Sequence, residues 1–339
     1  MAEDRRQGQG KRLDEFAIIA RYFAPLASTP GALGLRDDGA VLAPPEGHEL
    51  IVTCDTIVEG VHFHADDPPE SVGHKALAVN LSDLAAKGAR PYAYLLSLTL
   101  PGTPSPQWLE GFAAGLHALQ EEAGIALVGG DTTATRGTLS MTVTALGLVP
   151  RGTAVPRRGA KPGDRLYVTG SIGDAYLGLR LLQQPDLAQS LNLNADDVGF
   201  LIDRYQRPQA RTALALVIRN CAESAIDISD GLVGDIEKLC VVSRVGANIA
   251  LNAIPLSTAA RKAVTQDATL LDRLITAGDD YEVVVAVPGA SGAKFEAEAA
   301  KAGVEVTAIG AIVAGEGTVT VRDPEGRPIE LTGKGFSHF

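Results

Sequence analysis

The sequence predicts an α/β protein with mixed sheets, because short apolar runs that suit strands alternate with longer segments whose apolar residues recur at helical spacing. Many of these segments end at glycine or proline, as helices and turns do. A length of 339 residues suggests two domains of roughly 150 residues each. Segment 150–163 is rich in proline, glycine and arginine, so we expect the boundary there. The predicted parts are a flexible tail at 1–12, an N-terminal domain at 13–150 and a C-terminal α/β domain at 151–339.

The expected elements of the N-terminal domain follow from periodicity and from helix-ending residues. The helix over 71–87 is expected to stop at Gly88, with Pro91 just beyond it, and the helix over 107–123 at Gly124. Alternating or continuous apolar runs predict the strands. In chain order the elements are helix 15–26, strand 50–53, helix 71–87, strand 95–100, helix 107–123, strand 125–128 and strand 139–149.

The C-terminal domain is expected to open with a strand, a glycine-containing turn and a helix. Strand 165–169 leads through 170–173 into a helix that begins near Asp174. A glycine-containing strand-to-helix turn is a weak signal for a phosphate loop, because many such turns look alike. Further strands are expected at 224–228, 248–251, 281–287, 304–309 and 318–321.

The charge balance excludes some classes of partner. Lys and Arg number 30 and Asp and Glu number 41, a formal net charge of −11, which argues against a nucleic-acid or anionic-membrane surface. No apolar run reaches the roughly 18 residues of a spanning helix, and the first residues do not resemble a signal peptide. The three cysteines form no CxxC pair, as expected of reduced thiols. We therefore expect a cytoplasmic protein.

Aspartates repeatedly stand at the ends of apolar segments. Any one of them is more often a helix cap or a turn residue than a ligand. If several converge, two carboxylates about 4 Å apart repel by roughly 4 kcal/mol at an effective dielectric near 20. A divalent cation relieves that repulsion, and a set of oxygen donors favours Mg²⁺ over zinc. The aspartates in question are Asp37, Asp38, Asp55, Asp131, Asp227, Asp230, Asp279 and Asp280.

One further aspartate, Asp83, lies within a predicted helix. Leu77, Leu81 and Leu84 mark the core face of that helix. A neighbouring stripe of small and polar residues contains Ala76, Asn80, Asp83 and Lys87. Asp is a poor residue for a helix interior, so Asp83 is either a ligand or a solvated side chain on an exposed face.

No P-loop is present, and His62 and His64 alone are a weak zinc signal. Taken in order from about residue 14 to the C-terminus, however, several segments together resemble the thiamine-monophosphate kinases, a family whose superfamily includes aminoimidazole ribonucleotide synthetase. The segments that carry the resemblance are RDDGAVL from Arg36, TCDTIVEGVHF from Thr53, KALAVNLSDLAA from Lys75, VGGDTT from Val128, GAKPGD from Gly159, AIDISDGL from Ala225, GDDYE from Gly278 and GFSHF from Gly335.

The resemblance implies ATP-dependent phosphorylation of thiamine monophosphate to thiamine diphosphate, with several Mg²⁺ ions. Because phosphoryl transfer needs positioning and charge neutralisation more than a strong base, we expect direct in-line transfer without an acid–base residue. The resemblance also implies a two-domain fold like that of aminoimidazole ribonucleotide synthetase, whose N-terminal domain binds ATP and Mg²⁺ and pairs in a homodimer. Metal ligands implied in this way are Asp38, Thr53, Cys54, Asp55, Asp83, Asp131, Asp227 and Asp230. The implied ATP contacts are Gly130, Asp131, Arg157 and Ser229, and the implied thiamine-phosphate contacts are His62, Asp279 and Phe336.

Some positions depart from the family pattern. Arg36 stands where the family often has Gly, and Cys54 replaces a usual Thr, so only its carbonyl oxygen remains as a ligand. Asp279 replaces a Glu and shortens its reach, and Phe336 can stack but cannot hydrogen-bond. Alternative functions are another ATP-using reaction of the same superfamily, a metal-dependent phosphatase, or a non-catalytic protein that binds Mg²⁺ and nucleotide.

Overall fold

The computed structural model describes residues 14–333 and 335–336, so the predicted tail at 1–12 lies outside the described residues. The chain divides into two compact units, which we call unit 1 and unit 2. Unit 1 comprises the chain up to Ala43, Cys54–Ala76 and Ala93–Thr144. Unit 2 comprises Pro44–Thr53, Leu77–Tyr92 and the chain from Ala145 onward. Helices and sheets are mixed in both, which confirms the predicted α/β class.

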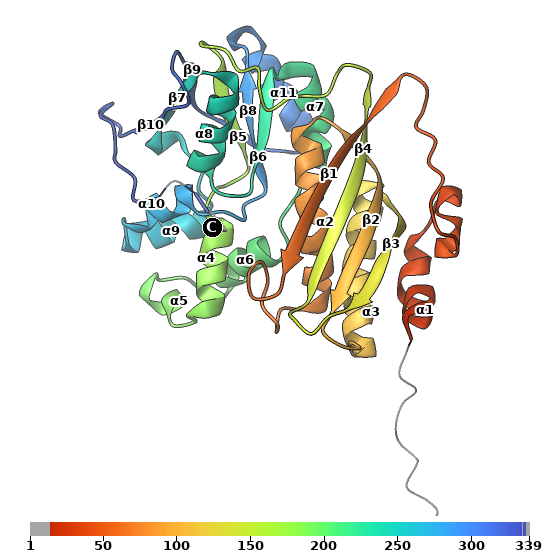
Figure 1. Ribbon diagram of the computed structural model, residues 1–339. Helices are drawn as coiled ribbons and strands as arrows, with labels where there is room; N and C mark the ends of the chain where they lie inside the picture. Colours follow the sequence, from red (N-terminus) through yellow and green to blue (C-terminus); the bar gives the residue numbers. More distant parts are fainter. Residues whose placement is uncertain (1–13, 334, 337–339) are drawn as a thin grey trace, which may run out of the picture. The chain divides into compact units, whose positions relative to one another are not determined.

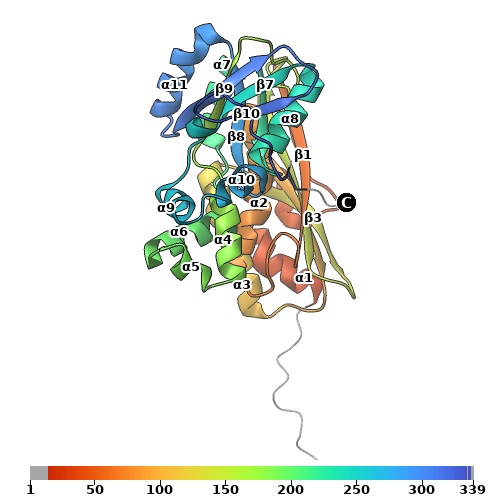
Figure 2. The ribbon, with the colours of Figure 1, turned by 90° about the vertical axis from the view of Figure 1, so that its left-hand side faces the viewer.

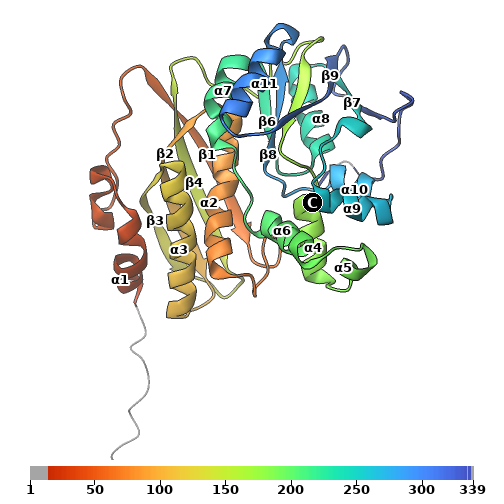
Figure 3. The ribbon, with the colours of Figure 1, turned by 180° about the vertical axis from the view of Figure 1, so that it is seen from behind.

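A four-stranded sheet in the order β1-β4-β2-β3 belongs to the N-terminal half of the chain. Strands β2 and β3 run parallel, with one irregularity in register. In unit 1, α3 and the first turns of α2 lie on one face of the sheet (Figure 3). The elements are β1 (His48–Val58), α2 (Pro69–Ala86), β2 (Arg90–Leu100), α3 (Pro106–Ala123), β3 (Ala126–Ala134) and β4 (Ser140–Pro150).

Two glycines allow α2 and α3 to approach each other closely. A Cβ atom on Gly73 would lie 2.1 Å from the carbonyl oxygen of Phe112, and one on Gly115 would lie 1.9 Å from that of Glu70. Real Cβ atoms do not approach this near, so larger residues would force the helices apart. The contact explains why the two helices pack as one layer.

Unit 2 holds a six-stranded sheet in the order β10-β7-β9-β5-β8-β6, with helices on both faces. Helices α7 and α11 cover one face and α8 covers the other (Figures 1 and 2). Every residue of β8 is buried, as expected for a strand covered on both sides. The strands are β5 (Arg165–Thr169), β6 (Ser224–Ile228), β7 (Gly246–Ala250), β8 (Glu282–Val287), β9 (Val306–Val313) and β10 (Val319–Arg322). The covering helices are α7 (Ala215–Cys221), α8 (Leu232–Ser243) and α11 (Gly292–Lys301).

A separate group of helices in unit 2 shares its own apolar core, which includes Leu177, Leu201 and Leu274. Gly178 brings α4 and α6 together, because a Cβ there would lie 2.0 Å from the carbonyl oxygen of Leu201. The group consists of α4 (Asp174–Gln183), α5 (Leu187–Ser190), α6 (Ala195–Gln206), α9 (Thr258–Gln266) and α10 (Leu270–Thr276).

The structure corrects two expectations about the first half of the chain. The helix expected over 15–26 is regular only as α1 (Glu15–Ile18) and continues as a π-helical turn and a 3₁₀ turn. The expectation that Asp55 and Asp131 follow their strands was wrong, since both lie inside β1 and β3. Asp131 pairs in register with Ser97 of β2, so backbone pairing continues beyond the apolar residues that marked the strand. No helix among the described residues has the length and apolar character to cross a membrane.

Candidate active site

The predicted site residues are divided between the two units, and each group is described by itself. Unit 1 holds Asp38, Cys54, Asp55, His62, Gly130 and Asp131. Unit 2 holds Thr53, Asp83, Arg157, Asp227, Ser229, Asp230, Asp279 and Phe336.

In unit 2, Asp83 is a paired residue of α2 and not a solvated one. Its carboxylate accepts a hydrogen bond from the Thr53 hydroxyl on β1, so two predicted ligands are in contact. The side chains of Leu77, Leu81 and Leu84 are all 0% exposed, which confirms the predicted core face of this helix. The helix therefore holds Asp83 rigidly beside β1.

Next to Asp83, Ser82 links α2 to the end of β6. Its hydroxyl donates to a carboxylate oxygen of Asp227 at 3.1 Å and to the Tyr281 carbonyl at 3.4 Å. Asp227 is only 7% exposed, so a hydrogen-bond donor at this position stabilises its charge. Within unit 2, α2 thus brings one predicted ligand against β1 and contacts a second on β6.

Lys87 is a cation of this region to which the sequence analysis gave no role. It ends the polar stripe of α2, and its ammonium donates to the Ala225 carbonyl at 3.2 Å. Burial lowers the pKa of Lys87, and the positive charge of Arg157 lowers it further, whereas Asp83 and Asp227 oppose that shift. Lys87 therefore lies in the field of three predicted site residues and partly neutralises the two carboxylates.

The turn after β6 presents Ser229 and Asp230. Both backbone N–H groups donate to one carboxylate oxygen of Asp235, at 3.1 and 2.9 Å. Lys238 pairs with Asp230 and, at 2.7 Å, with Asp235. Burial raises the pKa of Asp235, while Lys238 opposes that shift. Asp235 therefore fixes the backbone of this turn through its two hydrogen bonds, although nothing in the sequence had pointed to it.

The C-terminal segment reaches the same turn. The Phe336 N–H donates to the Asp230 carbonyl at 2.8 Å. The Phe336 ring is 52% exposed, which leaves an aromatic face accessible to a ligand.

The segment that carries Asp279 is conformationally strained. Asp279 and Tyr281 have φ angles of 74° and 50°, in the left-handed region that non-glycine residues rarely adopt. The Asp279 N–H donates to the Ser229 carbonyl at 2.9 Å, and the Tyr281 N–H to the Ile228 carbonyl at 2.8 Å. Contacts with the β6 turn therefore hold Asp279 in an unfavourable backbone conformation.

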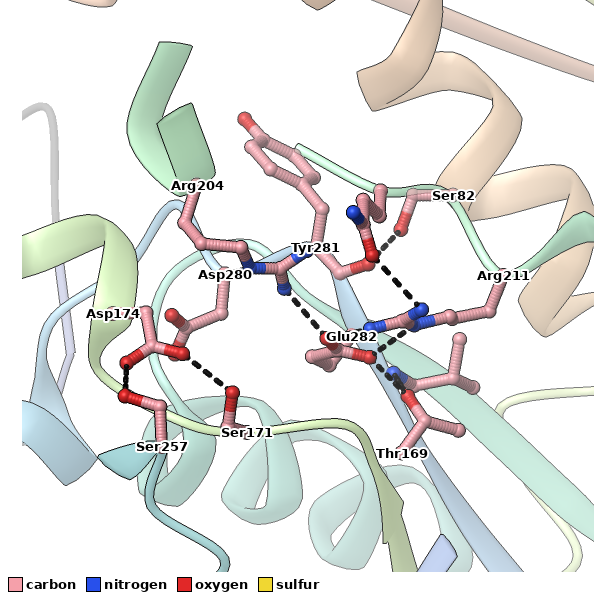
Figure 4. Close-up of polar contacts among 12 residues, drawn as sticks. Ser82, Thr169, Ser171, Asp174, Arg204, Arg211, Ser257, Asp280, Tyr281 and Glu282 are labelled. Carbon is pink, nitrogen blue, oxygen red and sulfur yellow. Dashed lines mark hydrogen bonds and ion pairs between the residues drawn. The ribbon is translucent and has the colours of Figure 1, made fainter. Parts of the chain in front are cut away.

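A buried network of charged side chains, centred on Glu282, directly follows this segment in the chain (Figure 4). Glu282 is 0% exposed and accepts hydrogen bonds from Thr169 at 2.6 Å, from Arg204 at 2.6 Å and from Arg211 at 2.6 and 2.5 Å. Asp280 accepts the Gly173 N–H with both carboxylate oxygens, at 3.0 and 2.9 Å. Sequence analysis missed this network because its members come from distant parts of unit 2.

In unit 1, Gly130 and Asp131 lie on β3, where the backbone passes very close to β2. A Cβ on Gly130 would lie 1.8 Å from the Leu96 carbonyl oxygen, so only glycine fits. Asp131 is exposed, and so is Asp38. On β1, the Cys54 thiol accepts a hydrogen bond from the Thr144 hydroxyl at 3.4 Å.

His62, also in unit 1, lies in a tight turn after β1. Its Nδ1 accepts the Val58 N–H at 3.0 Å, which places the proton of the neutral ring on Nε2. The buried ammonium of Lys75 donates to the His62 carbonyl at 2.8 Å. The turn thus fixes both the backbone and the ring of His62.

The donor chemistry of the predicted metal ligands fits Mg²⁺, because carboxylate, hydroxyl and carbonyl oxygens make up the set. Asp230 is already paired with Lys238. Among residues 14–333 and 335–336, no three His, Cys, Asp or Glu side chains form a group that could hold a metal ion. A cavity of about 700 Å³ in unit 2 is lined by residues such as Arg158, Lys161 and Ser243, and by none of the predicted site residues.

Comparison with known proteins identifies the family. Residues 36–149 match the model for the N-terminal domain of AIR synthase related proteins, and 161–322 match that for the C-terminal domain. The thiamine-monophosphate kinase of Escherichia coli K12 is 42% identical over 328 residues, which cover 96% of this chain and 98% of that protein.

Two solved structures share the fold over nearly the whole chain. The thiamine-monophosphate kinase of Stenotrophomonas maltophilia is 39% identical, with a TM-score of 0.82 over 94% of this chain and 98% of its own. AaThiL complexed with AMPPCP and TMP is 31% identical, with a TM-score of 0.76 over 98% of this chain and 100% of its own. The chain belongs to the AIR synthase related proteins and, among them, to the thiamine-monophosphate kinase family.

Proposed function

We propose that this protein transfers the γ-phosphate of ATP to thiamine monophosphate and releases thiamine diphosphate and ADP. One observation carries the proposal: the chain is similar over 98% of its length to a kinase structure that holds an ATP analogue and TMP. The contacts of Asp83 with Thr53, and of Asp227 with Ser82, support it, because they fix carboxylates that can hold Mg²⁺, the cation that neutralises anionic phosphates.

The proposed reaction is direct in-line attack by a phosphate oxygen of thiamine monophosphate on the γ-phosphorus. That oxygen carries no tightly held proton near neutral pH, so positioning and charge neutralisation matter more than a general base. Gly130, Asp131, Arg157 and Ser229 are the proposed nucleotide contacts. The fixed Nε2–H of His62, the carboxylate of Asp279 and the ring of Phe336 would orient the thiamine phosphate.

Mg²⁺ is part of the proposal. Asp38, Thr53, Cys54, Asp55, Asp83, Asp131, Asp227 and Asp230 would hold it, Cys54 through its carbonyl oxygen. When bound, the metal supplies positive charge that neutralises the phosphates of both substrates. For Asp230 to serve, the carboxylate has to exchange Lys238 for the metal.

We further propose a cytoplasmic homodimer in which residues 13–150 supply ATP and Mg²⁺ binding and the dimer contact, and 151–339 form the second domain. An exposed apolar side chain of unit 1 supports a contact on the first sheet: Leu95 of β2 is 38% exposed. Sedimentation at several concentrations tests the dimer, and a monomer at micromolar concentration contradicts it.

A chromatographic assay tests the reaction. Purified protein is incubated with ATP, Mg²⁺ and thiamine monophosphate, and each component is omitted in turn. We expect thiamine diphosphate and ADP in equal amounts only in the complete mixture, and almost none with Asp131→Asn. Asp186→Asn, an exposed aspartate without a proposed role, is the matched control and should behave as wild type.

The other functions predict different results in the same assay. A phosphatase releases inorganic phosphate without thiamine diphosphate. A superfamily enzyme with another acceptor binds ATP but leaves thiamine monophosphate unchanged, and a non-catalytic binding protein produces no ADP at all.

A further inference from the structure

Asp280 lies between two residues in strained conformations and is itself completely enclosed. Its side chain is 1% exposed, and Figure 4 shows it pointing toward Asp174 and the turn that carries Ser171. Both of its carboxylate oxygens accept the Gly173 N–H, at the start of α4. The neighbours Asp279 and Tyr281 both have positive φ angles. A side chain anchored between two strained residues is well placed to maintain that strain.

Segment 279–281, which Asp280 anchors, also contacts the residues around the turn after β6, where other predicted site residues lie. The Asp279 N–H donates to Ser229 and the Tyr281 N–H to Ile228, so 279–281 forms hydrogen bonds with the turn after β6. The Tyr281 hydroxyl lies 3.3 Å from a carboxylate oxygen of Asp279. The packing is tight there, since a Cβ on Gly278 would lie 2.2 Å from the Ser229 carbonyl oxygen. Movement of Asp280 would therefore displace Asp279.

We propose that Asp280 is a positioning residue for the acceptor substrate: by anchoring the strained segment 279–281 to the start of α4, it sets the place of the Asp279 carboxylate. The inference rests on the proposed function, in which Asp279 contacts thiamine monophosphate. Asp280 itself contacts no substrate atom. Release of the anchor lets Asp279 and Tyr281 relax from their strained left-handed backbone conformations, and the Asp279 carboxylate moves away from its place.

The turn that carries Ser229 and Asp230 has an anchor of its own. Asp235 accepts the N–H groups of both residues, so that turn keeps two hydrogen bonds in which Asp280 takes no part. Loss of the Asp280 anchor should therefore affect the acceptor much more than the nucleotide. A purely structural role would instead lower stability and change both substrates' kinetic constants alike.

The test compares Asp280→Asn and Asp280→Ala with a matched control, Asp164→Asn. Asp164 is also buried, at 6% exposure, and its carboxylate accepts the backbone N–H of Lys161 at 2.8 Å. It lies just before β5, at the end of that strand opposite to Gly173 and Asp280. For each variant, KM for thiamine monophosphate, KM for ATP, kcat and Tm are measured.

We expect Asp280→Ala, which removes both acceptor oxygens, to raise KM for thiamine monophosphate about tenfold, equivalent to about 1.4 kcal/mol, and KM for ATP less than about twofold. Asp280→Asn keeps one acceptor oxygen and should raise KM for thiamine monophosphate by a smaller factor. Asp164→Asn should change neither constant. If Asp280→Ala does not fold, Asp280→Asn decides alone. Equal changes in both constants, or no change, would overturn the inference while wild type still makes thiamine diphosphate. A wild type that makes none would overturn the proposed function and this inference with it.

Discussion

Glu282→Gln tests whether the buried network holds unit 2 together. The side chain of Glu282 is 0% exposed, that of Arg204 5% and that of Arg211 18%. Glutamine keeps the shape of the side chain but removes the negative charge, so two guanidinium groups face a neutral amide. One Arg204 nitrogen, Nη1, already lacks a hydrogen-bond partner, and the variant leaves more buried donors unsatisfied.

The expected cost follows from the contacts. Glu282 accepts three hydrogen bonds from the two arginines, at 2.5 to 2.6 Å. Glutamine has one acceptor oxygen. If it takes the place of Oε1, which accepts from both arginines, the bond from Arg211 Nε to Oε2 is lost, at about 1.5–3 kcal/mol, together with the bond from Thr169. Breaking a buried ion pair by removing one partner typically costs about 3–5 kcal/mol. We therefore expect unfolding free energy to fall by about 3–5 kcal/mol, a large part of the about 5–15 kcal/mol of a typical domain.

Urea unfolding followed by far-UV circular dichroism measures this change. With a slope of about 2 kcal/mol per molar urea, the midpoint should fall by roughly 1.5–2.5 M. Fluorescence of Trp108, on α3 of unit 1, gives a separate report on that unit. Glu298→Gln is the control, because Glu298 pairs with Lys301 at the surface and should shift nothing measurable. A loss below about 1 kcal/mol for Glu282→Gln would refute the reasoning.

Three more predictions follow from single positions. Gly130→Ala should prevent normal folding of the first sheet, since its Cβ would collide with the Leu96 carbonyl at 1.8 Å; a soluble variant with wild-type Tm would contradict this. In thiol labelling of the native protein, the exposed Cys54 should react first and Cys240 last, because burial raises the pKa of Cys240 to about 11; mass spectrometry of the labelled peptides gives the order. Burial raises the pKa of Asp280 well above its usual range, so the folded state keeps a proton that the unfolded state releases above about pH 4, and stability falls as pH rises through this window. Asp280→Asn should flatten that dependence of unfolding free energy on pH, and parallel curves for variant and wild type would count against it.

Much of the fold could be predicted from the sequence where a local pattern decides the structure. The strands at 165–169 and 224–228 have the predicted bounds, because each is a short apolar run between turn residues. The core face of α2 was also predicted correctly, since Leu77, Leu81 and Leu84 repeat at helical spacing.

Sequence patterns gave wrong strand ends where a strand continues beyond its apolar residues. They also missed contacts between residues that are far apart in the sequence. Asp55 and Asp131 lie within strands because neighbouring strands supply their backbone partners, which no spacing along the chain reveals. In the sequence, Glu282 attracted notice only as the last residue of the segment GDDYE. Its partners Arg204 and Arg211 are 78 and 71 residues away, and neither carries a local signal of burial.

The motifs predicted which residues are ligands, and the ligand roles stay predictions, whereas the residues that contact them were not predicted. Thr53 and Asp83 were both predicted, and the structure shows them in contact. Asp235 carried no signal, and Asp280 was noted only as one of the aspartates at segment ends, because hydrogen bonds to backbone N–H groups leave no pattern in the sequence.

The most direct test of phosphoryl transfer follows the γ-phosphate itself. ATP labelled in that group is mixed with thiamine monophosphate, Mg²⁺ and enzyme, and the reaction is stopped in acid within one turnover. We predict that the label appears in the terminal phosphate of thiamine diphosphate and that none remains on the protein. Label on the protein that then passes to thiamine diphosphate would contradict direct transfer, and label found only in free phosphate would contradict the kinase activity.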